Sequence, residues 1–295
     1  GGSGVVIIRV PSSVVAEFSA GVVYNYIPTD DFNVYEITAA GVSDTVTFSQ
    51  GAVTTVDNSL RFNDDDTAYL DGTYSASATN TKATFAFWYK SGFISASQML
   101  YQARDNNAVN NLRTFLQVAG GTFRVRMYNS AAAQVCALNT TRVFRDPSAW
   151  YHLVFQFDTT QATASDRVKL YVNGVLNTDY SVATTYPPLN FAFRTVSSVY
   201  TDIGRNGGVN TNLIDGYLAD YYFIDGQALD PSRFGKQDAD GVWQPITYTG
   251  TYGTNGFRLD FADNSTAAAL GTDVSGNGND WTPSGITTDD QVSDT

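Results

Sequence analysis

Two side chains in this sequence could act as a base or a nucleophile, and each type occurs once. His152 is the only histidine and Cys136 the only cysteine among 295 residues. A mechanism with a histidine base would have to use His152, yet alternation along 150–157 puts it on a packed strand face, where a structural role is the stronger interpretation. Cys136 lies in the apolar run QVCAL, which is typical of an inert core thiol. Neither residue predicts a catalyst.

Glycoside hydrolysis needs two carboxyl groups on either side of the bond that is cleaved, about 5 Å apart in a retaining enzyme. Glu17 and Glu36 are the only glutamates, and they do not share an expected strand. Aspartates alone could replace them. The sequence therefore predicts a protein that is not an enzyme, and a polysaccharide depolymerase is the least favoured alternative.

One loop carries oxygen side chains at the spacing of a calcium-binding loop. In 273–278, Asp273, Ser275 and Asn277 occupy positions one, three and five, and a glycine follows at position six. Position twelve is Ser284 instead of a bidentate glutamate, and no helical pattern flanks the loop, so an EF-hand is excluded. Two interpretations stay open, a calcium site or a solvated turn.

A second acidic loop follows the strand expected at 59–62. Asp64, Asp65 and Asp66 come directly after Asn63, and three carboxylates in one tight connection repel each other unless a divalent cation relieves the repulsion. The alternative is again a solvated turn without a ligand. Calcium is the one cofactor that the sequence suggests, at either loop.

Sugar binding would need exposed aromatic rings beside polar loop residues, because sugars present apolar faces for stacking and hydroxyl groups for hydrogen bonds. The chain has 18 tyrosines, but most aromatic side chains of a β-sandwich belong to its core. The sequence therefore fixes no single glycan site. Five loop residues are the candidates: Tyr186, Asn206, Asn212, Asp215 and Tyr252.

The composition predicts a folded all-β protein. Hydrophobic residues make up 43% of the chain, enough for a substantial core, and Asp, Asn, Gly, Ser and Thr dominate over strong helix formers. The formal net charge of −12 would repel a phosphate backbone, so nucleic acid is not an expected partner. The apolar run at 5–8 is too short for a membrane span, so membrane insertion is not expected either.

Period-two alternation marks the strands of a two-sheet sandwich. The segment TFAFWYK at 84–90 carries bulky groups on both faces, as expected for a strand inside such a sandwich. In WYHLVFQF at 150–157 one face collects the expected core residues Tyr151, Leu153, Phe155 and Phe157. We also expect Trp150 to be a core residue, whose truncation to alanine would cost roughly 3 to 5 kcal/mol.

The sequence RVKLYVNGVLN at 167–177 predicts a β-hairpin. Asn173 and Gly174 tolerate the positive φ angles of a type I′ turn, and apolar strand residues flank them. At the level of domains we expect a small β-rich segment at 1–50, the end of a glycine-rich region of a longer protein. The large sandwich then occupies 51–295, with a C-terminal extension from about residue 236.

A series of motifs carries a family resemblance. In order they are SLRFNDDDTAYLD, TFAFWYK, RDPSAWYHLVFQF, RVKLYVNGV, IGRN and DGYLADYYFID. They resemble the antiparallel, two-sheet jelly roll of laminin-G-like and concanavalin A-like domains in phage tail and virion proteins, over roughly 57–285. The segment DVSGNGND at 273–280 resembles the opening of many such modules although it stands near the end of this sequence. We expect it to pack back on the same sandwich.

The resemblance implies a structural and binding module of a phage appendage such as a tail fibre. Its place would be the virion, and its partners would be other virion proteins and host-surface glycans. The alternative is a purely structural virion component, such as capsid decoration or a fibre stalk, with no glycan ligand. Phage fibres are commonly trimeric, so the resemblance also implies a homotrimer.

Overall fold

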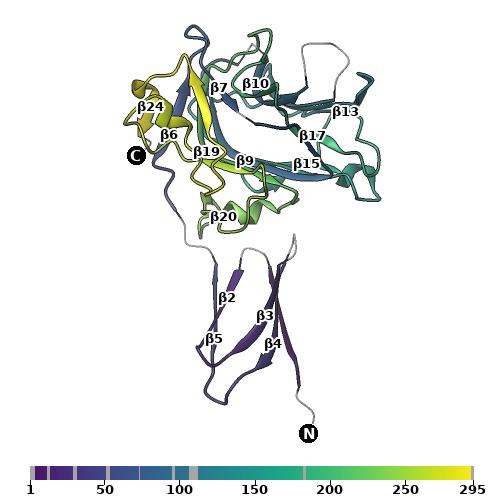
Figure 1. The fold of residues 1–295 in the computed structure, drawn as a ribbon, viewed down its shortest axis with the longest axis vertical. Helices are drawn as coiled ribbons and strands as arrows, with labels where there is room; N and C mark the ends of the chain where they lie inside the picture. The colour runs from purple at the N-terminus through teal and green to yellow at the C-terminus, as the bar shows by residue number, and fades with distance from the viewer. Residues whose placement is uncertain are drawn as a thin grey trace. The chain divides into compact units, whose positions relative to one another are not determined.

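The computed structural model confirms the antiparallel all-β class (Figure 1). It describes residues 4–11, 14–28, 32–50, 54–72, 74–94, 97–105, 112–181 and 184–293. All helices in these ranges are short 3-10 turns, and none of them is long and apolar enough to cross a membrane. The chain divides into two compact units, Gly1–Thr55 with Leu229–Gly250 and Val56–Ala228 with Thr251–Thr295. The predicted domain boundary at residue 50 stays a prediction.

The smaller unit contains a three-stranded sheet of order β1-β4-β3 and the strand pairs β2-β5 and β20-β21. Aromatic rings pack around the buried Tyr35, whose ring centroid lies 5.1 Å from that of Tyr26 and 5.3 Å from that of Phe18. Its elements are β1 (Val6–Pro11), β2 (Val14–Phe18), β3 (Val23–Pro28), β4 (Phe32–Ala39), β5 (Val46–Gln50), η2 (Pro231–Arg233), β20 (Gly235–Gln237) and β21 (Trp243–Pro245).

The larger unit is a sandwich whose first sheet has seven strands in the order β13-β12-β11-β10-β18-β7-β23. The strands are β7 (Tyr69–Gly72), β10 (Ser97–Arg104), β11 (Arg113–Ala119), β12 (Thr122–Tyr128), β13 (Gln134–Asn139), β18 (Tyr200–Ile203) and β23 (Trp281–Ser284). In Figure 1, β10 and β13 lie on one side of this unit, and β9, β15 and β19 lie on the other.

The second sheet has eight strands in the order β16-β15-β14-β9-β19-β6-β24, and β22 also pairs with β19. The strands are β6 (Asn58–Phe62), β9 (Lys82–Ser91), β14 (Tyr151–Asp158), β15 (Val168–Val172), β16 (Val175–Leu176), β19 (Gly216–Asp225), β22 (Phe257–Leu259) and β24 (Gln291–Ser293). A separate pair joins β8 (Ala78–Asn80) to β17 (Phe193–Val196), and the short turns are η1 (Ala164–Asp166), η3 (Ala268–Gly271) and η4 (Thr288–Asp290).

The core between the two sheets is built largely from aromatic rings. Phe85 on β9 is fully buried, and its ring centroid lies 4.5 Å from that of Tyr101 on β10 and 4.6 Å from that of Phe223 on β19. The predicted alternation in 150–157 is confirmed for Leu153, Phe155 and Phe157, which belong to this core, whereas Tyr151 is only partly buried and packs against it.

The prediction that Trp150 is a core residue is wrong. Its side chain is only half-buried, and its ring centroid lies 6.4 Å from that of Tyr217. The ammonium group of Lys90 lies 5.8 Å from the same ring. Trp150 precedes β14 and is out of phase with Tyr151 and Leu153, so its ring lies away from the space between the sheets.

Two predicted connections are confirmed. Asn173 and Gly174 have φ angles of 50° and 75°, which are the positive values of a type I′ turn, and they join β15 to β16. The C-terminal tail returns to the same sandwich, because β23 pairs with β7 in one sheet and β24 pairs with β6 in the other.

Candidate functional site

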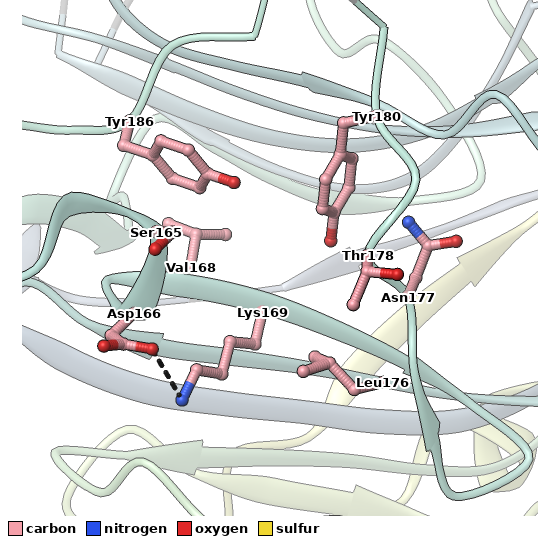
Figure 2. Close-up of a pocket in the computed structure, with 9 residues that line it drawn as sticks. All are labelled: Ser165, Asp166, Val168, Lys169, Leu176, Asn177, Thr178, Tyr180 and Tyr186. Carbon is pink, nitrogen blue, oxygen red and sulfur yellow. Dashed lines mark ion pairs between the residues drawn. The ribbon is translucent and has the colours of Figure 1, made fainter.

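A cavity of about 250 Å³ opens beside β15 and β16, where the eight-stranded sheet has its edge. Figure 2 shows the rings of Tyr180 and Tyr186 on one side of it, and Asp166, Lys169 and Leu176 on the other. Ser165, Val168, Asn177 and Thr178 complete the lining.

The path of the chain after the hairpin explains this arrangement. β16 ends at Leu176, and the chain then crosses to the edge of the other sheet, where Tyr180 and Thr185 form single β-bridges with Thr140 and Ala137. Tyr180 and Tyr186 are thus held by the seven-stranded sheet, while Asp166, Lys169 and Leu176 belong to the eight-stranded one. The cavity lies between the two sheet edges.

Arg167 fixes the segment that carries Tyr186. Its guanidinium donates to the carbonyl oxygens of Gln161 at 2.8 Å, Ala162 at 2.9 Å and Pro187 at 2.9 Å. Charge-assisted bonds to three carbonyls hold the residue after Tyr186 against the η1 loop. The backbone next to Tyr186 is therefore fixed to the η1 loop.

The cavity combines apolar faces with hydrogen-bonding groups of both kinds. Burial raises the pKa of Tyr180 to about 12 and also raises that of Tyr186, so both hydroxyls stay neutral near neutral pH. The Tyr180 hydroxyl oxygen is buried and has no hydrogen-bond partner among the described residues, so Tyr180 offers the cavity its ring. Lys169 and Asp166 form an ion pair at 3.2 Å, and both stay partly exposed to solvent.

This lining offers a polyol two kinds of contact. Aromatic rings stack on the apolar face of a sugar, and amide, hydroxyl and charged groups bond its hydroxyls. Asp166 is the one carboxylate among these lining residues. A neighbouring cavity of about 200 Å³ shares Leu176, Asn177 and Thr178 and extends the opening toward Arg142 and Asp179.

The loop with calcium-type spacing uses its oxygens differently. Asp273 is 7% exposed, and its carboxylate accepts four hydrogen bonds. Oδ1 accepts from the backbone N–H groups of Arg258 at 2.9 Å and Ser275 at 2.8 Å. Oδ2 accepts from the Ser275 hydroxyl at 2.9 Å and the Asn279 N–H at 2.9 Å. Four donors occupy the lone-pair directions that a cation would need.

The amides of the same loop act as donors. Asn277 Nδ2 donates to the carbonyls of Gly253 at 2.7 Å and Gly256 at 2.8 Å, and Asn279 Nδ2 donates to Gly256 at 2.9 Å. The loop therefore ties the 253–256 segment to the start of β23. This geometry gives the calcium prediction for Asp273, Ser275 and Asn277 no support.

The second acidic loop, Asp64 to Asp66, interacts electrostatically with Asp215, another of the predicted residues. Burial raises the pKa of Asp215, and the negative charges of Asp64 and Asp65 raise it further, while the positive charge of Arg61 lowers it. Asp66 Oδ2 accepts from the Asn63 amide at 2.5 Å. In the part of the chain that is described, no group of three or more His, Cys, Asp and Glu side chains is arranged to hold a metal ion.

The other glycan candidates are separate from the cavity. Asn206 and Asn212 belong to the loop after β18, where the Asn206 N–H donates to Thr211 at 2.7 Å and Asn212 adopts a φ of 57°. Tyr252 lies before β22, with its ring centroid 6.4 Å from that of Tyr222. Tyr186 is thus the one predicted residue in the cavity lining.

Neither His152 nor Cys136 is placed for catalysis. His152 is 1% exposed, its ring centroid lies 4.9 Å from that of Trp88, and burial lowers its pKa to about 3. Burial raises the pKa of the Cys136 thiol, which belongs to the core cluster. A neutral, buried imidazole and a protonated, buried thiol cannot meet a substrate in solution.

The antiparallel two-sheet fold is that of a lectin-type β-sandwich. A family model described as the concanavalin A-like lectin/glucanases superfamily matches residues 62–233, more than half of the chain. The protein belongs to this superfamily. The search of curated proteins gives no match.

Solved structures with the same fold are distant in sequence. One is a Bacteroides ovatus protein described as a candidate carbohydrate-binding protein, with a TM-score of 0.53, 12% identity and coverage of 98% of this chain and 92% of that chain. Another is a heptameric SAP-like pentraxin from Limulus polyphemus, with a TM-score of 0.40, 16% identity and coverage of 60% and 80%. At 12% identity the likeness to the Bacteroides ovatus protein shows the fold alone.

Proposed function

We propose that this chain is a non-catalytic glycan-binding module and that a saccharide binds between Tyr180 and Tyr186. The observation that carries the proposal is the pair of tyrosine rings beside the polar side chains of Asp166, Lys169 and Asn177. The solved structure described as a candidate carbohydrate-binding protein, which shares the fold over nearly the whole chain, adds support. Binding without release of reducing sugar is the expected behaviour.

Tyr186→Ala is expected to weaken saccharide binding about tenfold or more, because it removes one stacking face of the cavity. Tyr186→Phe keeps the ring and should lose less. The measurement is a glycan-array screen of the whole chain, followed by titration calorimetry with the best saccharide, both in calcium and in chelator. Tyr252→Ala is the matched control, and equal losses in Tyr186→Ala and Tyr252→Ala would reject the cavity as the site.

We further propose that the module serves a bacteriophage appendage and is displayed on the virion, with other virion proteins as partners. The support is the order of motifs from SLRFNDDDTAYLD to DGYLADYYFID, which resembles phage tail and virion proteins. Peptide mass spectrometry of purified particles tests the placement. Chain peptides in intact particles are the expected result, and their absence from pure particles would reject it.

We also propose a homotrimer that associates through the smaller unit. β1 and β3 are the outer strands of its three-stranded sheet, and Ile7, Val23 and Ile27 are exposed on them. Outer strands with exposed apolar residues favour association with another chain. Light scattering is expected to give three times the chain mass, and Ile7→Asp should shift the protein toward the monomer. Val42→Asp, in the turn after β4, is the control that should not.

A further inference from the structure

A row of partly exposed side chains crosses the outer face of the eight-stranded sheet. The neighbouring strands β6, β19 and β9 alternate core residues with outward-facing ones (Figure 1). Tyr217 on β19 faces outward, and the pairing register places it between Arg61 on β6 and Lys90 on β9. Trp150, directly before β14, continues the row beyond Lys90. Trp88 lies on the same face of β9, two residues before Lys90.

Aromatic rings hold the ammonium group of Lys90 in this row. It lies 5.8 Å from the ring centroid of Trp150 and 5.6 Å from that of Tyr217, and the two centroids are 6.4 Å apart. Cation–π attraction acts at these distances. In the described ranges Lys90 forms no ion pair, whereas Lys82 and Lys169 each pair with an aspartate. Because the chain has 29 acidic residues, a lysine held by rings and left without a carboxylate indicates a charge that is available to a ligand.

The carboxylates on β19 and beside β6 interact with arginines instead of this lysine. Asp220 Oδ1 accepts from Arg258 Nε at 2.8 Å. Asp290 forms an ion pair with Arg61 at 3.8 Å. Burial raises the pKa of Asp215, which lies before β19, and the positive charge of Arg61 lowers it. The acidic groups therefore gather at the Arg61 end of the row, and the other end keeps its positive charge.

The polar atoms of the aromatic residues in this row can be reached from solvent. Among the described residues, the indole N–H groups of Trp88 and Trp150 and the hydroxyl of Tyr217 have no hydrogen-bond partner, and none of these three atoms is sealed from water. By contrast, the hydroxyl of the core residue Tyr89 donates to Gln98 at 3.1 Å. Half-buried rings with an accessible polar end offer a ligand both apolar area and hydrogen bonds.

We propose that this row is a second binding site, for a saccharide whose rings carry carboxylate groups. The apolar face of a sugar ring would pack on Trp150 and Tyr217, and its carboxylate would accept from the Lys90 ammonium group. Sugar hydroxyl oxygens would accept from the indole N–H groups. This end of the row supplies donors and a positive charge but no carboxylate, which favours an anionic sugar over a neutral one. The proposal does not depend on the cavity at Tyr180 and Tyr186.

The test is titration calorimetry of the whole chain with oligosaccharides of galacturonate, alginate and hyaluronate. Two matched probes accompany them: the methyl ester of each oligosaccharide, which keeps the rings and loses the charge, and oligoglutamate, which keeps the charge and has no sugar ring. We expect at least one acidic saccharide to bind, with an affinity that falls as salt rises, and both matched probes to bind at least about tenfold more weakly. Binding of none of the three, or equal binding of either matched probe, would overturn the proposal.

Lys90→Gln and Trp150→Ala should each weaken this binding about tenfold or more, because one removes the charge-assisted hydrogen bond and the other a stacking face. Lys82→Gln is the matched control and should change it less than about twofold, since Lys82 lies on the same face at the other end of β9, roughly 26 Å away at the usual rise of a strand. Thermal melting of each variant shows that it is folded. Tyr186→Ala should leave this binding unchanged. Equal losses in Lys90→Gln and Lys82→Gln would overturn the proposal even if the Tyr186 cavity binds sugar.

Discussion

Phe85→Ala is expected to lower the free energy of unfolding by roughly 3 to 5 kcal/mol. The ring is fully buried between the sheets and packs against Tyr101, Phe157 and Phe223, so its removal leaves a cavity that rigid neighbouring rings cannot fill. Urea denaturation followed by tryptophan fluorescence measures the loss.

Trp150→Ala is the matched control for that measurement. Trp150 is a larger aromatic residue, but it is half-buried outside the core, so its truncation should cost roughly 1 to 2 kcal/mol, less than that of Phe85. A loss at Trp150 equal to or above the loss at Phe85 would contradict the placement of both residues.

The contrast between these two residues shows what the sequence pattern could predict about the fold. Alternation is a local property of an extended chain, so it assigned Leu153, Phe155 and Phe157 to the core correctly. The same alternation places Trp150 on the opposite face from these residues. His152 and Val154, on the same face as Trp150, are buried, but Trp150 lies just before the start of β14, where burial depends on neighbours that are distant in sequence.

The candidate site was predictable only in part. Tyr186 could be named as a ring beside prolines in a loop, but Tyr180, Asp166 and Lys169 carried no signal of their own. These three residues lie beside Tyr186 because Tyr180 and Thr185 form single β-bridges with Thr140 and Ala137, at the edge of the seven-stranded sheet.

In the 273–280 loop the spacing of the oxygen side chains was visible in the sequence, but the sequence did not show what these oxygens bind. Oxygen side chains at alternate positions fit a calcium loop and equally fit a turn that caps backbone N–H groups. The decisive donor from Arg258 lies on β22, 15 residues before Asp273 in the sequence. Only the folded structure distinguishes a carboxylate oxygen that is free to bind a cation from one that already accepts two hydrogen bonds.

Asp273→Ala is accordingly expected to cost roughly 3 to 5 kcal/mol of stability, because it leaves the N–H groups of Arg258, Ser275 and Asn279 without their acceptor. Asp273→Asn keeps the shape of the side chain, but its NH₂ group is a donor and cannot accept from two of those donors. We therefore expect it to lose most of the same stability. Asp65→Ala removes an exposed carboxylate of the other acidic loop and should change stability by less than about 0.5 kcal/mol. Urea denaturation of the four proteins gives the comparison.

Calcium separates the two interpretations of Asp273 in the same set of proteins. A cation that binds only the folded chain raises its melting temperature in proportion to the logarithm of its concentration. If the carboxylate is saturated by its four donors, millimolar calcium and chelator should give the same melting temperature for the parent, and Asp273→Ala should be destabilised equally in both. A calcium-dependent rise in the parent that Asp273→Ala abolishes and Asp65→Ala retains would instead show that the loop opens to bind the ion, at the expense of the bonds from Ser275 and Asn279.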